Sequence, residues 1–225
     1  MAGVTEDIIV KKSFRSEIAY ALGIILLALG TSLMELADFG MSMVVAPAYI
    51  IYLKVSQYYA FFTFGMAEYC LQLVLIILLS IVLKKFEKWY LFSFVTAVLY
   101  GMVLDFFMRL VSVLPSDAFY QRSILFVAGM LICAAGVAFF LHTRYAPEAY
   151  ELIVKEISQK KKLDVVKVKT TYDISSLLVS VILSFIFFGF LTFKGVKLGT
   201  LLTALLNGWV IGKISSFLDK KFDAN

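Results

Sequence analysis

Long apolar stretches separated by short polar segments dominate the pattern of this chain. Crossing a bilayer core of about 30 Å takes roughly 20 helical residues. Six stretches come close to or exceed that length, at residues 18–36, 58–83, 90–114, 123–141, 173–193 and 196–217. The first follows a basic segment, as a signal peptide would, but no small-x-small cleavage site comes after it. The pattern therefore predicts an all-α integral membrane protein with six transmembrane helices.

Two inserts between these stretches differ from ordinary loops. Residues 37–57, which contain Pro47, are too apolar for an exposed loop and too short to span, so we expect an interfacial or re-entrant segment that caps an outward-facing cavity. Residues from about 147 to 162 begin with Pro147 and carry apolar side chains at helical spacing, which predicts an amphipathic helix along the cytoplasmic membrane surface. Asp173 is then expected to open the fifth spanning helix as an N-cap or first-turn carboxylate.

The same order of parts is written twice along the chain. The segment 23–30 returns at 129–136, and the segment 96–103 returns at 203–210. The pair Ala46-Pro47 is echoed by Ala146-Pro147. Because each unit contains an odd number of crossings, the second must be inverted relative to the first. We therefore expect a single membrane domain over residues 1–225, built from two inverted three-helix repeats.

These repeats have definite limits. The first covers residues from about 18 to 114 and the second residues from about 123 to 217. The amphipathic cytoplasmic helix, about 147–162, lies between the fourth and fifth transmembrane helices.

Composition and charge place the chain in a membrane and set its orientation. Hydrophobic residues make up 61% of it and the mean hydropathy is +0.91, whereas soluble domains are about 45–50% apolar. The net charge of +5 would suggest nucleic acid as a partner of a soluble protein. Here, a cytoplasmic N-terminus puts 16 of the 21 basic residues inside, which is the positive-inside pattern and not a nucleic-acid footprint. Both termini are therefore predicted to be cytoplasmic.

Motifs along nearly the whole chain carry a family resemblance. They are Gly30-Thr-Ser-Leu-Met, Ala37-Asp-Phe-Gly-Met-Ser, Tyr100-Gly-Met-Val-Leu-Asp, Tyr172-Asp and the stretch 195–208. In this order they resemble the YczE/YitT type of bacterial membrane protein, although the soluble C-terminal domain of the YitT branch has no counterpart here. The resemblance implies a six-helix, multi-pass protein of the bacterial inner (plasma) membrane. It leaves the substrate open, because that family is largely without an assigned function.

Polar side chains within the spans are candidates for a site, because an ionisable group near a bilayer centre costs at least ~2.5–3.5 kcal/mol. At about 1.5 Å per residue, they fall in one layer between the membrane centre and its outer face. Residues four apart share a helix face, which joins Glu68 to Gln72 and Asp105 to Arg109. The candidate substrate-binding residues are Glu68, Gln72, Asp105, Arg109, Asn207, Glu35, Asp38, Tyr69 and Tyr100.

Structural alternatives accompany the four-apart pairs and the amide on the last helix. Asp105 and Arg109 can neutralise each other as an intrahelical ion pair. Glu68 and Gln72 can hold helices together by hydrogen bonds, and so can the amide of Asn207. The sequence leaves these alternatives open.

The remaining candidates lie nearer the outer face or are aromatic. Asp38 follows the first helix, where it can brace the outer insert or receive a substrate amine. Glu35 lies at the outer end of the same helix. Tyr69 and Tyr100 are deep enough to stack on a ligand, whereas most other aromatic residues belong to the interfacial belt.

Transport of a small organic solute through a cavity near the membrane midplane is the function that these features favour. The cavity would be lined by Glu68, Gln72, Asp105 and Asn207, and its excess of carboxylates favours a cationic, zwitterionic or proton-coupled substrate. The expected partners are the lipid bilayer, a small-molecule substrate and a coupling proton or ion, with a homo-oligomer or partner subunits left open. No nucleic acid is expected.

Two alternatives and one exclusion complete the prediction. The chain could be the substrate-binding subunit of an energy-coupling-factor type importer that contacts its partners through the Ala19-x-x-x-Gly23 face. It could instead be a non-transporting scaffold or sensor whose amphipathic helix docks a cytoplasmic partner. No enzyme, cofactor or metal site is expected, because the sequence has no nucleophile motif and no paired metal ligands.

Overall fold

The computed structural model describes residues 12–14, 16–143, 145 and 148–224. Two features of the sequence analysis lie outside these residues: the Ala146-Pro147 echo of the repeat, and the basic residues Lys11, Arg15 and Arg144.

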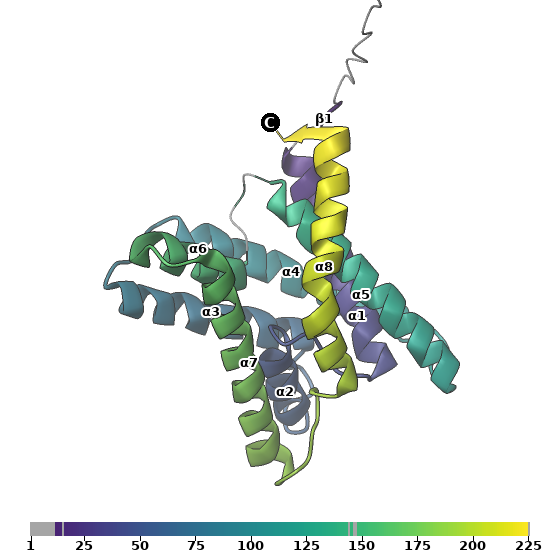
Figure 1. Cartoon of the computed structure of the whole chain (residues 1–225). Helices are drawn as coiled ribbons and strands as arrows, with labels where there is room; N and C mark the ends of the chain where they lie inside the picture. Colours follow the sequence, from purple (N-terminus) through teal and green to yellow (C-terminus); the bar gives the residue numbers. More distant parts are fainter. Residues whose placement is uncertain (1–11, 15, 144, 146–147, 225) are drawn as a thin grey trace, which may run out of the picture.

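Eight helices and two short strands make up the described structure (Figure 1). The helices are α1 (Ser16–Ala37), α2 (Ala46–Val55), α3 (Phe64–Leu83), α4 (Tyr90–Val111), α5 (Phe119–Leu141), α6 (Ala149–Lys161), α7 (Val165–Phe188) and α8 (Leu198–Lys221). The strands β1 (Lys12–Phe14) and β2 (Phe222–Ala224) pair in parallel, which brings the first and last described residues close together.

Six of the helices are long and apolar enough to cross a membrane: α1, α3, α4, α5, α7 and α8. They correspond to the six predicted stretches and are those of a multi-pass membrane protein. The outer insert contains α2, a ten-residue helix that is too short to span.

The start of α7 contradicts the sequence-based prediction. The helix begins at Val165 and its N-cap is Asp164, whose side chain accepts the backbone N–H of Lys167. Asp173 lies two turns inside α7 and pairs with Lys169 at 3.0 Å. Charged residues four apart support each other on a helix. The helix α7 therefore starts about two turns before its apolar segment. Hydropathy alone therefore placed the start of the helix too late.

The most extensive helix contact joins α1 to α5, which cross along their glycines. A Cβ atom added at Gly30 would lie 2.6 Å from the carbonyl oxygen of Gly129, and one added at Gly136 would lie 2.6 Å from the backbone nitrogen of Leu27. Small residues let membrane helices approach until their backbones touch. These glycines are therefore requirements of packing.

The two halves of the chain share an order of elements and a set of packing partners. Each half has a long helix, a short helix and two long helices, α1 to α4 and then α5 to α8. Helix α1 packs on α4 as α5 packs on α8, and α2 packs on α7 as α6 packs on α3. One contact is stronger in the first half: α3 packs closely on α4 through Gly65 and Gly101.

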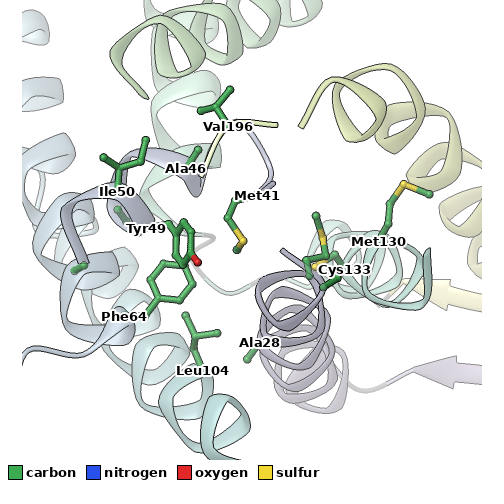
Figure 2. Close-up of a cluster of buried hydrophobic side chains, with 14 of the residues drawn as sticks. Ala28, Met41, Ala46, Tyr49, Ile50, Phe64, Leu104, Met130, Cys133 and Val196 are labelled. Atoms are coloured by element: carbon green, nitrogen blue, oxygen red, sulfur yellow. The ribbon is translucent and has the colours of Figure 1, made fainter. Parts of the chain in front are cut away.

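A hydrophobic cluster surrounds the short helix α2 and extends between α1 and α5. Figure 2 shows Tyr49, Ile50 and Phe64 packed together on one side and Met130 with Cys133 on the other. Tyr49 and Phe64 lie edge to face with ring centroids 5.2 Å apart, a geometry that aromatic pairs prefer. The outer insert is thus anchored in the protein by its aromatic residues.

A second cluster joins α6 to α3 and α4. Leu152 and Ile153 of α6 pack against Ile76, Leu79 and Tyr90. The predicted amphipathic helix exists within the expected range, and helices of the same chain cover its apolar side. That side therefore packs within the chain. The cytoplasmic location of α6 stays a prediction.

Candidate functional site

The start of α6 is held by the side chain of Gln72 on α3. The side-chain oxygen Oε1 accepts the backbone N–H of Ala149 at 3.0 Å, and the amide nitrogen Nε2 donates to Oε2 of Glu148 at 3.5 Å. Gln72 is fully buried. Because the first N–H groups of a helix have no partner within the helix, the amide supplies one from a neighbouring element.

One turn earlier on α3, Glu68 also faces α6. The Tyr150 hydroxyl donates to Oε2 of Glu68 at 2.7 Å, and both side chains are buried. The shared face that the sequence predicts for Glu68 and Gln72 is therefore the face that packs on α6. Together with Glu148 and Tyr150, they form what we call the α3/α6 polar cluster.

The α3/α6 polar cluster leaves two carboxylate oxygens without partners. Oε1 of Glu68 and Oε1 of Glu148 are buried and form no hydrogen bond within the described part of the chain. No lysine, arginine or histidine described by the structure forms an ion pair with either residue. Burial raises the pKa of Glu148 well above its usual value, and the charges of Glu151 and Glu68 raise it further. The cluster can therefore hold a proton or another positive charge.

Tyrosines from neighbouring helices surround the cluster. The ring of Tyr172 on α7 lies 6.4 Å from the ring of Tyr150, centroid to centroid. The hydroxyl of Tyr100 on α4 is buried and donates to the hydroxyl of Thr31 on α1 at 3.0 Å. Tyr100 lies within electrostatic range of Glu68 and Glu148. The cluster thus lies where elements of both halves of the chain meet.

Asp105 forms a separate contact at the start of α3. Its carboxylate accepts the hydroxyl of Thr63 at 2.6 Å and the backbone N–H of Gly65 at 2.8 Å. In the described structure it forms no ion pair with Arg109, which is exposed. The intrahelical ion pair considered from the sequence is therefore absent, and the observed contacts hold the N-terminus of α3 against α4.

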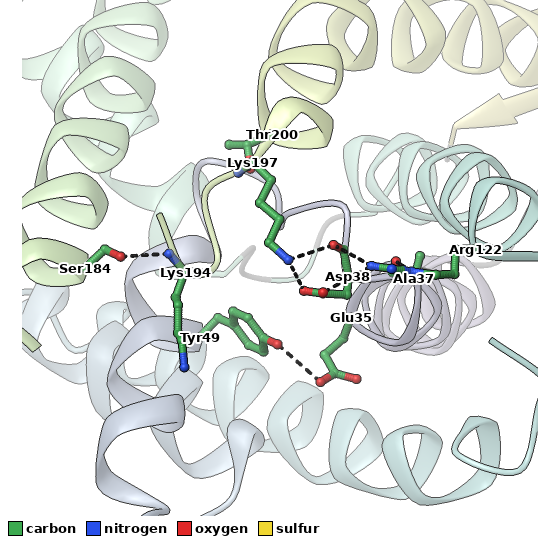
Figure 3. Close-up of polar contacts among 9 residues, drawn as sticks. All are labelled: Glu35, Ala37, Asp38, Tyr49, Arg122, Ser184, Lys194, Lys197 and Thr200. Carbon is green, nitrogen blue, oxygen red and sulfur yellow. Dashed lines mark hydrogen bonds and ion pairs between the residues drawn. The ribbon is translucent and has the colours of Figure 1, made fainter. Parts of the chain in front are cut away.

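Figure 3 shows the polar contacts at the far end of α1, where Asp38 pairs with two basic side chains. Arg122 on α5 lies 3.1 Å from Asp38, and Lys197, next to α8, lies 2.6 Å from it. Arg122 also donates to the carbonyl oxygen of Ala37 at 2.7 Å, so it supplies a partner to the end of α1. Asp38 was predicted either to stabilise the outer insert or to bind a substrate amine, and these contacts fit the first role.

The other three predicted residues lie apart from the α3/α6 polar cluster. Glu35 accepts the hydroxyl of Tyr49 at 3.3 Å, which links α1 to α2. Tyr69 is half-buried beside Gly101. Asn207 lies on α8, which packs on α5, and its buried Oδ1 has no hydrogen-bond partner in the described structure.

Sequence reasoning missed Glu148 and Tyr150. It gave neither residue a place in the site. One signal could have found them: an acid and an amide four apart in an apolar helix need polar partners inside the protein. The amphipathic helix is a polar-rich segment that can supply them.

Comparisons with known proteins identify a family. Residues 14–216 match DUF6198, which is described as a family of unknown function. Neither the curated proteins nor the solved structures provided a match. Because the family match runs from β1 to the last turns of α8, the chain belongs to the DUF6198 family.

Proposed function

We propose that this chain is a transporter that binds a small organic solute and moves it across the bacterial inner membrane. The observation that carries the proposal is the α3/α6 polar cluster. Ionisable groups buried in a membrane protein are expensive and typically mark substrate or ion pathways. Two buried carboxylates with unpartnered oxygens, Glu68 and Glu148, are a stronger case than a satisfied polar core.

The arrangement of the two halves supports the same proposal. Many secondary transporters consist of inverted repeats and bind their substrate where the repeats meet. Here α3 of the first half meets α6 of the second at the cluster. We infer that the halves are inverted repeats, that both termini are cytoplasmic and that the chain is related to the YczE/YitT type.

Neither alternative function gains support from the contacts. The face proposed for importer subunits is occupied within the chain: Ala19 is fully buried and Gly23 lies against Phe140 of α5. The apolar side of α6, which a scaffold would offer to a partner, packs on α3 and α4. Both alternatives would require these surfaces to be free.

Ligand-dependent thermal stability of the purified chain tests the proposal. A compound from a metabolite library at about 100 times its Kd should stabilise the folded protein by about 2.7 kcal/mol. That compound should also accumulate in proteoliposomes. Glu68→Gln should lose both effects, whereas Glu17→Gln, a change of the same kind at an exposed position, should keep them. Uptake that is equal in wild type and Glu68→Gln would contradict this site.

A further inference from the structure

The unpartnered oxygens of the α3/α6 polar cluster indicate what the cluster binds. We propose that Glu68 and Glu148 together bind one monovalent cation at the interface of α3 and α6. This inference rests on the proposed function, which places the solute or ion pathway at the same cluster. It is nevertheless testable without any transport measurement.

One proton on the pair of carboxylates leaves one negative charge, which a bound cation can offset. Glu68 and Glu148 are 0% and 4% exposed, so water does not offset their charges. Two described lysines of α6 and α7 are paired elsewhere: Lys160 with Glu156 and Glu87, and Lys169 with Asp173. Two carboxylates without a cation cannot both stay ionised in a site of low dielectric constant. A single bound charge, with one proton on the pair, resolves this conflict.

The protein holds the two carboxylates in fixed positions. The Tyr150 hydroxyl fixes one oxygen of Glu68 at 2.7 Å, and the Gln72 amide contacts one oxygen of Glu148 at 3.5 Å. In each carboxylate the other oxygen, Oε1, is the free one. Gln72 is itself fixed by the N–H of Ala149. Two positioned acceptors without donors are what a cation requires.

The small number of carboxylates favours a monovalent ion over a divalent one. Calcium takes six to eight oxygen ligands and magnesium about six. The described residues contain no group of three or more histidine, cysteine, aspartate or glutamate side chains placed to hold a metal ion. A cation of one charge needs less neutralisation, and hydroxyls and amide oxygens can complete its shell. Sodium, potassium and the ammonium group of an organic amine share this chemistry.

Other titratable groups face the cluster but do not neutralise it. They are Tyr20 from α1, Tyr100 from α4, Cys133 from α5, Glu151 from α6 and Tyr172 from α7. None of these groups carries a positive charge. The cation must therefore come from outside the described residues.

Thermal unfolding of the purified full chain in detergent tests this site. The titrants are sodium, potassium and methylammonium chloride, with ionic strength held constant by N-methyl-D-glucamine chloride. We expect a saturable rise of Tm with at least one titrant. The titrant that acts separates an inorganic ion from an amine. The apparent affinity should be about tenfold or more weaker in Glu68→Gln and Glu148→Gln and unchanged in Glu17→Gln.

A second measurement uses only the wild type, so it stands even if the variants do not fold. A membrane-permeant carbodiimide labels buried carboxyl groups, and mass spectrometry locates the label. The cation that raises Tm should slow the labelling of Glu68 and Glu148. Absence of any cation-specific rise in Tm, a rise that both glutamine variants retain, or labelling that no cation slows would overturn the inference. Cation binding without solute uptake would support the cation site and remove the transport proposal.

Discussion

Gln72, in the middle of α3, accepts the backbone N–H of Ala149, the first residue of α6, at 3.0 Å. A buried side chain on one helix thus supplies the cap of another helix that lies far away in the sequence. The same amide contacts Glu148. One residue therefore contributes both to the position of the start of α6 and to the electrostatics of the α3/α6 polar cluster.

Replacing Gln72 should weaken the contact between α3 and the start of α6. Gln72→Met keeps the length of the side chain but leaves the Ala149 N–H and one Glu148 oxygen without partners, which costs about 1–3 kcal/mol for a buried polar group. Thermal unfolding should show this loss, and hydrogen exchange should increase at the start of α6. Gln159→Met, at an exposed position on α6, is the matched control. Equal Tm values for the two variants would show that the cap is unimportant.

The glycines of α1 should tolerate no side chain where the helices cross. A Cβ atom at Gly30 would lie 2.6 Å from Gly129 O and from the backbone nitrogen of Cys133, and neither backbone atom can move easily. Gly30→Ala should therefore destabilise the protein by about 1–3 kcal/mol, the usual cost of overpacking.

Gly208→Ala is the control for the crossing of α1 and α5, because a Cβ atom at Gly208 has nothing within 4 Å. We expect a Tm equal to or slightly above that of the wild type, since alanine restricts the unfolded chain. If Gly208→Ala destabilises the protein as much as Gly30→Ala does, close packing is not the reason for the glycines of α1.

Asp105 should matter through Thr63 and Gly65, not through Arg109. Asp105→Ala removes the acceptor for the Thr63 hydroxyl and the Gly65 N–H, and capping losses of this kind cost about 0.5–2 kcal/mol. The double change with Arg109→Gln should be no more stable than Asp105→Ala, because the described structure has no ion pair to relieve. Restored stability in the double variant, measured by thermal unfolding, would instead establish coupling to Arg109.

The apolar pattern predicts the long helices well because burial in lipid or protein requires it over a whole span. The apolar pattern does not predict helix ends that are set by polar residues. Asp173 was expected to start α7, yet Asp164 caps that helix and Lys169 pairs with Asp173 inside it. Local spacing cannot distinguish these two acids, since both suit a helix start.

The same limit applies to the candidate site. Glu68 and Gln72 could be found because two polar side chains in an apolar helix require polar partners inside the protein. Glu148 and Tyr150 are harder to find, because a segment of mixed polarity suits the membrane surface equally well. Their role depends on which helix α6 packs against, and that contact joins residues about 80 positions apart.

The ionic contacts at the end of α6 should make stability depend on pH. Lys160 lies 2.8 Å from Glu87 and Lys85 lies 3.2 Å from it. The hydrogen bond from Lys160, followed by that from Lys85, lowers the pKa of Glu87. A carboxylate with a lowered pKa stabilises the fold above the ordinary glutamate pKa, and this stabilisation is lost as pH falls through the lowered value.

Glu87→Gln should remove that part of the pH dependence. In unfolding curves from neutral to acidic pH, the wild type should be more stable than the variant at neutral pH, and the two should converge in acid. High salt should narrow the difference, because exposed ion pairs are screened. A difference that stays constant over the whole pH range would show that Glu87 acts by packing and not by charge.

The orientation of the chain can be read from two exposed positions. The excess of basic residues predicts that the loop before α5 is external and that the end of α6 is cytoplasmic. In a background without Cys70 and Cys133, a cysteine at Asp117 should react with an impermeant thiol reagent in intact cells, and one at Lys161 should react only after the membrane is permeabilised. Both side chains are exposed, so burial does not explain a lack of reaction. The pairing of β1 with β2 adds a consequence, since residues 12–14 and 222–224 lie together and should therefore be found on one side of the membrane. The reverse pattern of labelling would invert the orientation and place α6 on the external face.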